Sequence, residues 1–372
     1  MPPNAKGDVG LPARRRRRPV PTEGSGAAPV TRAGGRRAVT ITEVARRAGV
    51  SPATVSRVMN DRFVGDPAVA ERVRATATEL DYTPSPLARG LALGRTQTVG
   101  FLVPDLANPS FHAVLSSIGK AAAPDGYRLL VTDSGEQPQA EPHLALETRR
   151  RCDGIVLCAP RMPDAELLRL LDALRPVVLV NRPAAVPRVP SVGVDYGAGM
   201  RALAQHLVGL GHRDLVYLEG PAASSSNGHR LDALAQVERE QPDIRVRRIA
   251  AGSTSEDGYR VAGAVAASGA TAALAFNDLV AVGLLGGLRA AGLRVPEDVS
   301  VTGFDDIPSA RYAIPSLTTA SVPVDALGAA TWARLHALLT GGDPEHDVMF
   351  SPRLEPRDST APPRPHGAPQ HS

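Results

Sequence analysis

A short stretch near residue 50 gathers side chains that could contact a nucleic acid. Its sequence, "SPATVSR", runs from Ser51 to Arg57 and contains three hydroxyls and one guanidinium. Hydroxyls can donate hydrogen bonds to phosphates or bases, and a guanidinium can bind guanine at O6 and N7 together. Apolar residues at helical spacing share the stretch, so two interpretations remain: a helix that enters a DNA groove, or one that only helps to build a helical core.

A second set of polar residues follows strand-like runs further along the chain. Asn277 and Asp278 come after "TAALAF", Asp305 and Asp306 come after "VSVTGF", and Arg230 is predicted to begin a helix after the Ser-rich loop "ASSSNGH". Ligands of parallel α/β sheets bind outside the carboxyl ends of the strands. An amide, a carboxylate and a guanidinium at one cleft suit a ligand with many hydroxyls, such as a sugar, or another small polar metabolite.

Some of these polar residues have a structural alternative. We expect Asp278 to cap a helix and Asp306 to cap the turn before Pro308, rather than to contact a ligand. For Asp305 and Arg230 we expect ligand contact, because a buried charge without a partner is costly.

The elements that position "SPATVSR" are three short predicted helices within residues 39–84. Thr40 with Glu43 forms a candidate capping box for the first, which ends at Gly49. Ser51-Pro52 and Asp66-Pro67 are start signals for the second and third, with a capping residue followed by proline. This arrangement is typical of a helix-turn-helix. The apolar residues expected to form its core are Ile41, Val44, Ala45, Ala48, Val55, Val58, Met59, Val69, Val73, Ala77 and Leu80.

Beyond residue 96, strand-like runs alternate with helical stretches of ten or more residues, which favours parallel α/β sheets with right-handed crossovers. The region is long enough for two sheets. The fold class predicted is therefore multi-domain, with an all-α head followed by a two-lobed α/β domain at residues 98–358. The predicted strands are "TVGFLV", "YRLLVTD", "DGIVLC", "PVVLV", "DLVYL", "TAALAF" and "VSVTGF".

Charge is distributed unevenly along the 372 residues. Residues 1–98 carry a net charge of +9 and the remainder −5, within a total of +4. A basic front and a mildly acidic body suggest an N-terminal part that meets a polyanion. Residues 1–38, with five consecutive arginines, should be disordered, and so should residues 359–372. The arginines either add nonspecific attraction to phosphates or form a solvated extension.

Two cysteines, Cys152 and Cys158, lack the spacing of a metal site and are expected to be reduced thiols. We expect no metal, no cofactor and no catalytic residues. No apolar run approaches the ~20 residues of a membrane span, and no apolar segment follows the N-terminal arginines as in an export signal. These features predict a soluble protein without membrane contact, in the cytoplasm and at the nucleoid.

Longer stretches resemble one known family. "VTITEVARRAGVSPATVSRVMN" is similar to the DNA-binding head of the LacI/GalR family of bacterial transcription regulators. The resemblance covers roughly residues 39–357 and implies a periplasmic-binding-protein-like regulatory domain. Its downstream motifs, in the family's order, are "VGFLVPDLANPSF", "DGIVLCAP", "HLVGLGHRDLVYLEGP", "AFNDLVAVGLLGGLRAAGLRVPEDVSVTGFDD" and "IPSLTT".

The resemblance implies roles for the second helix. Arg57 is the strongest candidate for reading a base directly, because its guanidinium can make the two-point contact with guanine. The residues implied to face base edges are Pro52, Ala53 and Arg57, and those implied to donate hydroxyls to phosphates or bases are Ser51, Thr54 and Ser56.

Further specificity is expected from a linker at residues 85–97. Its segment "SPLARGLALG" is too short to hold a helix alone in water. By resemblance, it is a hinge helix that folds when two subunits pair over an operator. Leu91 then matches a leucine wedged between base steps in the minor groove, with Arg89 beside it.

The resemblance also implies an effector site between the two lobes. Phe111 could equally be a core aromatic. The residues that match effector-contacting positions are Arg230, Asn277 and Asp305 and, on the opposite lobe, Ser110 and Phe111.

These features predict a repressor that binds a pseudo-palindromic double-stranded operator as a homodimer, or as a tetramer, under control of a sugar-like effector. A periplasmic solute-binding protein is disfavoured by the basic head and the missing export signal. An enzyme using Asp305 and Asp306 is disfavoured because no nucleophile motif is present and neighbouring carboxylates in extended chain point to opposite sides.

Overall fold

The computed structural model describes residues 39–83, 95–183, 189–344 and 347–364. It divides into two units, residues 1–84 and 85–372. The predicted N-terminal tail and most of the predicted linker, including Arg89 and Leu91, lie outside the described residues.

The first unit consists of the three predicted helices: α1 (Ile41–Ala48), α2 (Pro52–Met59) and α3 (Pro67–Glu79). Gly49 ends α1 with φ +67°, a left-handed conformation that glycine adopts without steric cost. Ser51 Oγ accepts the Thr54 N–H at 3.1 Å and starts α2, as predicted. The prediction of a capping box at the start of α1 is wrong, because the Thr40 side chain makes no capping hydrogen bond.

The core of this unit is the one predicted from helical spacing except at Val69, which does not pack in it; Ala70, the next residue of α3, does so instead. Val44, Val55 and Val73, one from each helix, are completely buried against one another. Burying a side chain of this size stabilises the fold by about 1.5–3 kcal/mol. Packing of these three apolar stripes therefore holds α2 at a fixed angle to α1, although each helix alone is too short to be stable.

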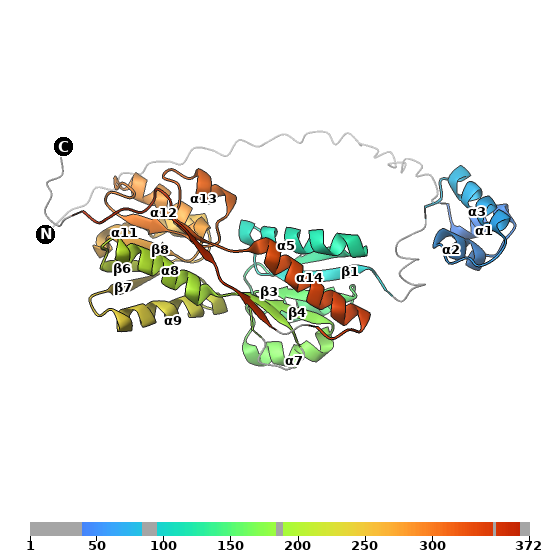
Figure 1. Ribbon diagram of the computed structural model, residues 1–372, viewed down its shortest axis with the longest axis horizontal. Coiled ribbons are helices and arrows are strands. Elements are labelled where there is room, and N and C mark those ends of the chain that lie inside the picture. Colours follow the sequence, from blue (N-terminus) through green and yellow to red (C-terminus); the bar gives the residue numbers. More distant parts are fainter. Residues whose placement is uncertain (1–38, 84–94, 184–188, 345–346, 365–372) are drawn as a thin grey trace, which may run out of the picture. The chain divides into compact units, whose positions relative to one another are not determined.

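The second unit begins with a lobe built on a six-stranded parallel sheet of order β11-β5-β4-β3-β1-β2. Helices α5 and α14 cover one face of this sheet, and α7 covers the other (Figure 1). Helix α6 shares an apolar core with α7 and so lies on the same face. The strands are β1 (Thr98–Val103), β2 (Arg128–Asp133), β3 (Gly154–Cys158), β4 (Val177–Val180), β5 (Ser191–Val194) and β11 (Val348–Phe350). The helices are α5 (Pro109–Ala122), the short 3-10 helix η1 (Ala123–Asp125), α6 (Glu141–Arg149), α7 (Asp164–Leu174) and α14 (Val324–Thr340).

The other lobe is built on a four-stranded parallel sheet of order β7-β6-β8-β9. Figure 1 shows α8 and α9 on one face of this sheet and α12 on the other. The strands are β6 (Asp214–Glu219), β7 (Arg245–Ala250), β8 (Ala272–Ala275) and β9 (Ser300–Thr302). The helices are α8 (Tyr196–Gly209), α9 (Ser225–Glu240), α10 (Ser255–Arg260), α11 (Ala262–Ser268), α12 (Asp278–Ala290) and α13 (Pro308–Tyr312).

Three crossings of the chain join the lobes: between β5 and α8, between β10 (Thr319–Ser321) and α14, and between β11 and β12 (Arg353–Glu355). Strands β10 and β12 pair antiparallel, which ties two of the crossings together. One apolar core includes residues of both sheets, so the lobes share part of their interior.

The prediction that residues 359–372 are disordered is wrong for residues 359–364, which the structure describes. Ser359 is completely buried, and its hydroxyl donates to the Val301 carbonyl at 2.6 Å and accepts from the Thr318 N–H at 2.8 Å. The Ala361 carbonyl also accepts a hydrogen bond from His212 at 2.8 Å. Tertiary hydrogen bonds with the second lobe order a segment that its composition alone leaves unstructured.

All seven predicted strands are present, and the described residues contain five others that were not predicted: β5, β7, β10, β11 and β12. Strand β7 has the sequence "RVRRIA" and lies at a sheet edge, where its charged side chains stay exposed. The other four strands have three or four residues each, too few to show a pattern.

Both cysteines are free and buried, in agreement with the sequence. Burial raises the pKa of Cys152 to about 11 and that of Cys158 to about 12. In the described part of the chain, no helix is both long and apolar enough to cross a membrane.

Candidate functional site

Helix α2 turns its apolar residues inward and its polar residues outward. Val55 and Val58 are buried, whereas Ser51, Pro52 and Ala53 at the start of the helix are exposed. Thr54 and Ser56 are half-exposed on the same unit. Six of the eight residues predicted to contact DNA are therefore accessible, one at the cap of α2 and five on its first two turns; the other two, Arg89 and Leu91, lie outside the described residues.

Arg57 is the exposed cation of this surface. Its Nε donates to the Ala53 carbonyl at 3.3 Å, which keeps the side chain along the helix. Within residues 39–83, Arg47 pairs with Glu79 and Arg74 pairs with Asp61, but no ion pair involves Arg57. Its guanidinium is thus available to an external acceptor.

The five predicted effector residues line one cavity in the second unit, with Ser110 and Phe111 contributed by the first lobe. Phe111 also packs on the shared apolar core, so both of its predicted roles are compatible. The other wall comes from the second lobe and contains Arg230, Asn277 and Asp305. The cavity measures about 30 Å³, enough for about two water molecules.

Arg230 is the most enclosed charge of the cavity, with 1% of its surface exposed. Three aromatic rings surround its guanidinium, whose central carbon lies 4.4 Å from the ring centre of Tyr196, 4.6 Å from that of Phe276 and 4.2 Å from that of Phe304. Its Nη1 donates to the Ser226 carbonyl at 3.0 Å, but its buried Nε has no partner. Because α9 begins at Ser225, Arg230 lies in the second turn and not at the helix start as predicted.

Asp305 occupies a strained backbone position on the same wall, with φ +106°. Strain of this kind, in a residue other than glycine, is concentrated at ligand sites. Burial raises the pKa of Asp305 to about 7, although the positive charge of Arg230 and a hydrogen bond from the Ser110 side chain both lower it. The contact with Ser110 joins the two lobes across the cavity.

The neighbouring carboxylates have structural roles. Asn277, not Asp278, caps α12, because its side chain accepts the Val280 N–H at 2.9 Å. Asp278 is buried and accepts hydrogen bonds from Thr319 Oγ1 at 2.6 Å and from the Ile307 N–H at 2.8 Å. The predicted capping role of Asp278 is therefore wrong, but the expectation that it would not contact a ligand agrees with these bonds.

Asp306 was expected to cap the turn before Pro308. Its carboxylate instead forms an ion pair with Arg357 at 2.5 Å. A residue 51 positions away in the sequence supplies this partner, so the local pattern of residues could not indicate it.

Sequence reasoning missed a charged pair on the first-lobe wall. The Arg161 guanidinium donates two hydrogen bonds to the Glu136 carboxylate, at 2.7 and 2.8 Å. Buried Glu141 accepts the Arg161 and Met162 N–H groups at 2.7 Å and so fixes the loop. Glu136 and Arg161 follow the carboxyl ends of β2 and β3, so the rule that selected Asp305 could have found them.

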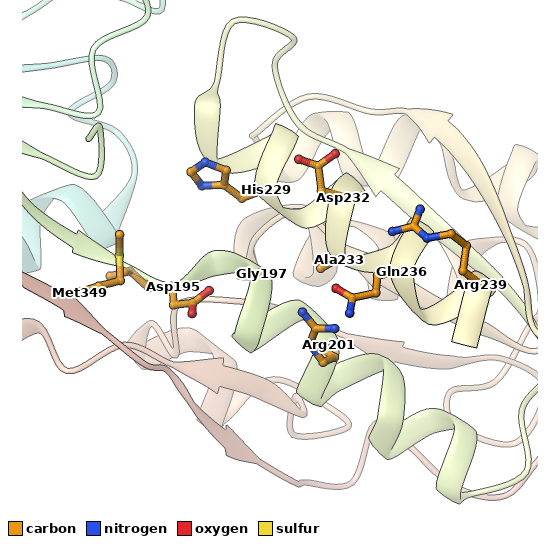
Figure 2. Close-up of a pocket in the computed structure, with 10 residues that line it drawn as sticks. Asp195, Gly197, Arg201, His229, Asp232, Ala233, Gln236, Arg239 and Met349 are labelled. Carbon is orange, nitrogen blue, oxygen red and sulfur yellow. The ribbon is translucent and has the colours of Figure 1, made fainter. Parts of the chain in front are cut away.

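A larger hollow lies outside the cavity. Figure 2 shows this groove of about 420 Å³, which is flanked by Arg201 of α8 and by Gln236 and Arg239 of α9, with Met349 of β11 at one end. None of the predicted effector residues lines it. Volume alone therefore does not identify the site where buried charges of both lobes converge.

The geometry defines a class of protein: a helix-turn-helix head with an exposed polar helix, followed by two α/β lobes around a polar cavity. Residues 40–85 match the model of bacterial regulatory proteins of the lacI family, and residues 204–360 match a periplasmic binding protein-like domain. The chain belongs to the LacI family.

Individual relatives agree with this assignment. The transcriptional regulator GalR of Escherichia coli (strain K12) is 35% identical over 338 residues, which cover 87% of this chain and 96% of GalR. The repressor PurR of Proteus mirabilis is 31% identical, with 87% of this chain and 97% of PurR covered.

Solved structures also match. The lac repressor dimer bound to operator and the anti-inducer ONPF is 27% identical, with a TM-score of 0.79 over 87% of this chain and all of that chain. A complex of the transcriptional regulator CelR with cellobiose is also 27% identical, with a TM-score of 0.63, over 86% of this chain and 99% of that chain.

Proposed function

We propose that the protein is a transcriptional repressor that binds a pseudo-palindromic operator as a homodimer and is controlled by a small polar effector in the interlobe cavity. One observation carries the proposal: a single chain joins an exposed polar helix on a helix-turn-helix unit to a cavity where buried polar groups of two lobes meet. The lac repressor structure with operator and anti-inducer, a dimer, supports it.

On the DNA side, the proposal assigns base contact to Pro52, Ala53 and Arg57, and contact with phosphates or bases to Ser51, Thr54 and Ser56. Exposure of the start of α2 supports this assignment, since the N-terminal residues of a recognition helix are those that reach base edges. In the linker, Leu91 and Arg89 remain proposed minor-groove contacts.

On the effector side, the proposal assigns ligand contact to Ser110, Phe111, Arg230, Asn277 and Asp305. A ligand of sugar size needs more room than the cavity of about 30 Å³ provides, so binding requires the lobes to move apart. The effector shifts the population of open and closed lobes, and its differential affinity for the two states is passed to the operator.

The test is a selection of genomic fragments bound by the purified full-length chain, at two salt concentrations. Nonspecific phosphate contacts weaken by orders of magnitude as salt rises, whereas base-specific contacts persist. We expect one pseudo-palindromic sequence to survive at high salt and metabolites to alter its binding. Complete loss of enrichment at high salt would mean that the head binds only phosphate, and the proposal would fail.

A further inference from the structure

We infer that the protein has a second ligand site, separate from the interlobe cavity, which binds a small phosphate monoester that carries hydroxyl groups. The site is the groove of about 420 Å³ shown in Figure 2. Pockets for small molecules usually measure about 300–1,000 Å³, so this groove already has the room that the interlobe cavity lacks. The inference goes beyond the proposed function and does not rest on it, because it concerns other residues.

Small residues leave the groove open between α8 and α9. Gly197 of α8 faces Ala233 of α9, and a Cβ added at Gly197 would lie 3.9 Å from the Cβ of Ala233. The residues of α9 that line the groove recur every three or four positions, so they share one face of the helix: His229, Asp232, Ala233, Gln236 and Arg239. Met349 at one end belongs to β11 of the first lobe, so a ligand in the groove would contact both lobes.

Two guanidiniums that line the groove have no partner within the protein. Arg201 comes from α8 and Arg239 from the last turn of α9, and Figure 2 shows Gln236 between them. In the described part of the chain, neither arginine makes an ion pair or a side-chain hydrogen bond. Glu240 accepts a hydrogen bond from Gln236 Nε2 at 2.6 Å and pairs with neither guanidinium. Both guanidiniums are therefore available to an external anion.

A phosphate monoester matches these two guanidiniums in charge and in geometry. It carries a charge of about −1.5 to −2 at pH 7 and three acceptor oxygens, against the two positive charges of Arg201 and Arg239. Each guanidinium can direct two parallel N–H donors at such a group. A carboxylate has one negative charge and two oxygens, so it would balance only one of the two arginines.

Two carboxylates line the rest of the groove and favour hydroxyl groups there. Asp195 lies beside Met349 in Figure 2, and its Oδ1 is already bound by the Ala198 N–H at 2.8 Å. Asp232 is exposed, has no ion pair among the described residues, and precedes Arg239 by two turns of α9, about 10 Å along the helix axis. A second anionic group would be repelled at this position, whereas a hydroxyl can donate to the carboxylate. The ligand that fits both parts is therefore a phosphorylated polyol, such as a sugar phosphate.

The test begins with binding of phosphate monoesters to the full-length protein, measured by isothermal titration calorimetry without DNA. The probes are glucose 6-phosphate, ribose 5-phosphate and glycerol 3-phosphate, with inorganic phosphate beside them. We expect at least one monoester to bind saturably, with an affinity that falls as salt rises, because the groove is open to solvent. Absence of saturable binding below ~10 mM for every monoester would overturn the inference.

Two substitutions locate the bound monoester. Arg201→Gln and Arg239→Gln lie outside the interlobe cavity, and each should weaken binding of the same monoester at least ~10-fold, because each removes a charge-assisted contact. Arg289→Gln is the matched control: it removes an exposed arginine of α12, on the opposite face of the same sheet, and should leave the affinity unchanged. Undiminished affinity in either groove variant, or an equal loss in Arg289→Gln, would overturn the inference.

A third substitution tests the contact with hydroxyl groups. Asp232→Ala removes a negative charge, which affects sugar phosphate and inorganic phosphate alike, so the ratio of their affinities isolates the hydroxyl contact. We expect the preference for the best-binding monoester over inorganic phosphate to fall at least ~3-fold. An unchanged ratio would contradict the assignment of a hydroxyl-bearing ligand. Because every measurement is of ligand binding without DNA, a negative result would leave the proposed repressor function untouched.

Discussion

At the scale of single residues, this protein uses charged side chains in two opposite environments. Arg57 is exposed on α2 and has no ion-pair partner among residues 39–83. Arg230 is buried among three aromatic rings, which fix the direction of its donors. Exposed charge suits DNA because phosphates and base edges supply the partners, whereas buried charge must be balanced within the fold or by a ligand.

The role proposed for Arg57 predicts different effects for two substitutions. Arg57→Ala should weaken operator binding about 5- to 150-fold, because a two-point contact with guanine is worth about 1–3 kcal/mol. Arg57→Lys keeps the positive charge but not the planar fork, so it should retain nonspecific affinity and lose preference at one base pair. Fluorescence anisotropy with operator and scrambled duplexes measures both. A lysine variant with undiminished operator preference would show that Arg57 contacts only phosphate.

The raised pKa of Asp305 predicts that the stability of the protein depends on pH. Its folded pKa of about 7 lies above the unfolded value of 3.8, so the folded protein holds more protons between these values. Stability should therefore fall as pH rises towards 7 and then level off. Between pH 5 and pH 8, wild type should lose about 2–3 kcal/mol more unfolding free energy than Asp305→Asn, at 1.36 kcal/mol per pKa unit. Urea unfolding at the two pH values tests this, and equal losses would contradict it.

At the scale of elements, glycines set the packing of α10 against α12 in the second lobe. A Cβ added at Gly283 would overlap the carbonyl oxygen of Ser255, and one added at Gly258 would overlap the carbonyl oxygen of Val280. The obstacles are backbone atoms, which cannot rotate away. The two helices can approach this closely only because neither glycine has a side chain, and this contact fixes the position of α12, whose cap is Asn277.

Replacing a glycine by alanine is expected to destabilise the fold strongly at Gly283 and not at Gly263. Gly283→Ala should lower the unfolding free energy of the second unit by about 2–3 kcal/mol, as in other overpacked cores. Gly263→Ala is the matched control, because an added Cβ there meets no atom within 4 Å and alanine favours a helix by up to about 1 kcal/mol. Urea unfolding monitored by circular dichroism compares them. Equal stabilities would mean that the backbones separate at little cost.

At the scale of the whole second unit, the chain after β12 runs back along the second lobe. The Val301 N–H donates to the Ser359 carbonyl at 2.8 Å, and the Ser359 N–H donates to the Ser316 carbonyl at 2.9 Å. With the contacts of the Ser359 hydroxyl, these bonds satisfy backbone groups at the β9 edge of the sheet. Residues at the far end of the sequence thus complete the lobe that contains Asp305.

Two truncations of the chain test how much these C-terminal hydrogen bonds stabilise the second lobe. Ending the chain after Asp358 should lower unfolding free energy by about 2–4 kcal/mol, because several buried backbone groups lose their partners at about 1–3 kcal/mol each. Ending it after Arg364 keeps all of these bonds and should change stability little. Thermal unfolding of the two truncated proteins measures the difference. Similar melting temperatures would show that water replaces Ser359 without loss.

The sequence by itself determined the elements whose signals are local. Start residues and helical spacing predicted α1–α3, and apolar runs predicted the seven central strands, because these patterns depend only on residues close in sequence. The carboxyl-end rule also selected Arg230, Asn277 and Asp305, since parallel strands bring their ends to one edge.

Only the tertiary structure decided which partner each buried group would have. Asp306 pairs with Arg357, Arg161 with Glu136, and Ser359 binds β9, and each contact joins residues more than 20 positions apart. The charged edge strand β7 and the ordered segment after Asp358 are also formed by such contacts. The physical reason is that a polar group is satisfied by whatever the fold places within about 3 Å, and residue type and spacing along the chain do not encode that distance.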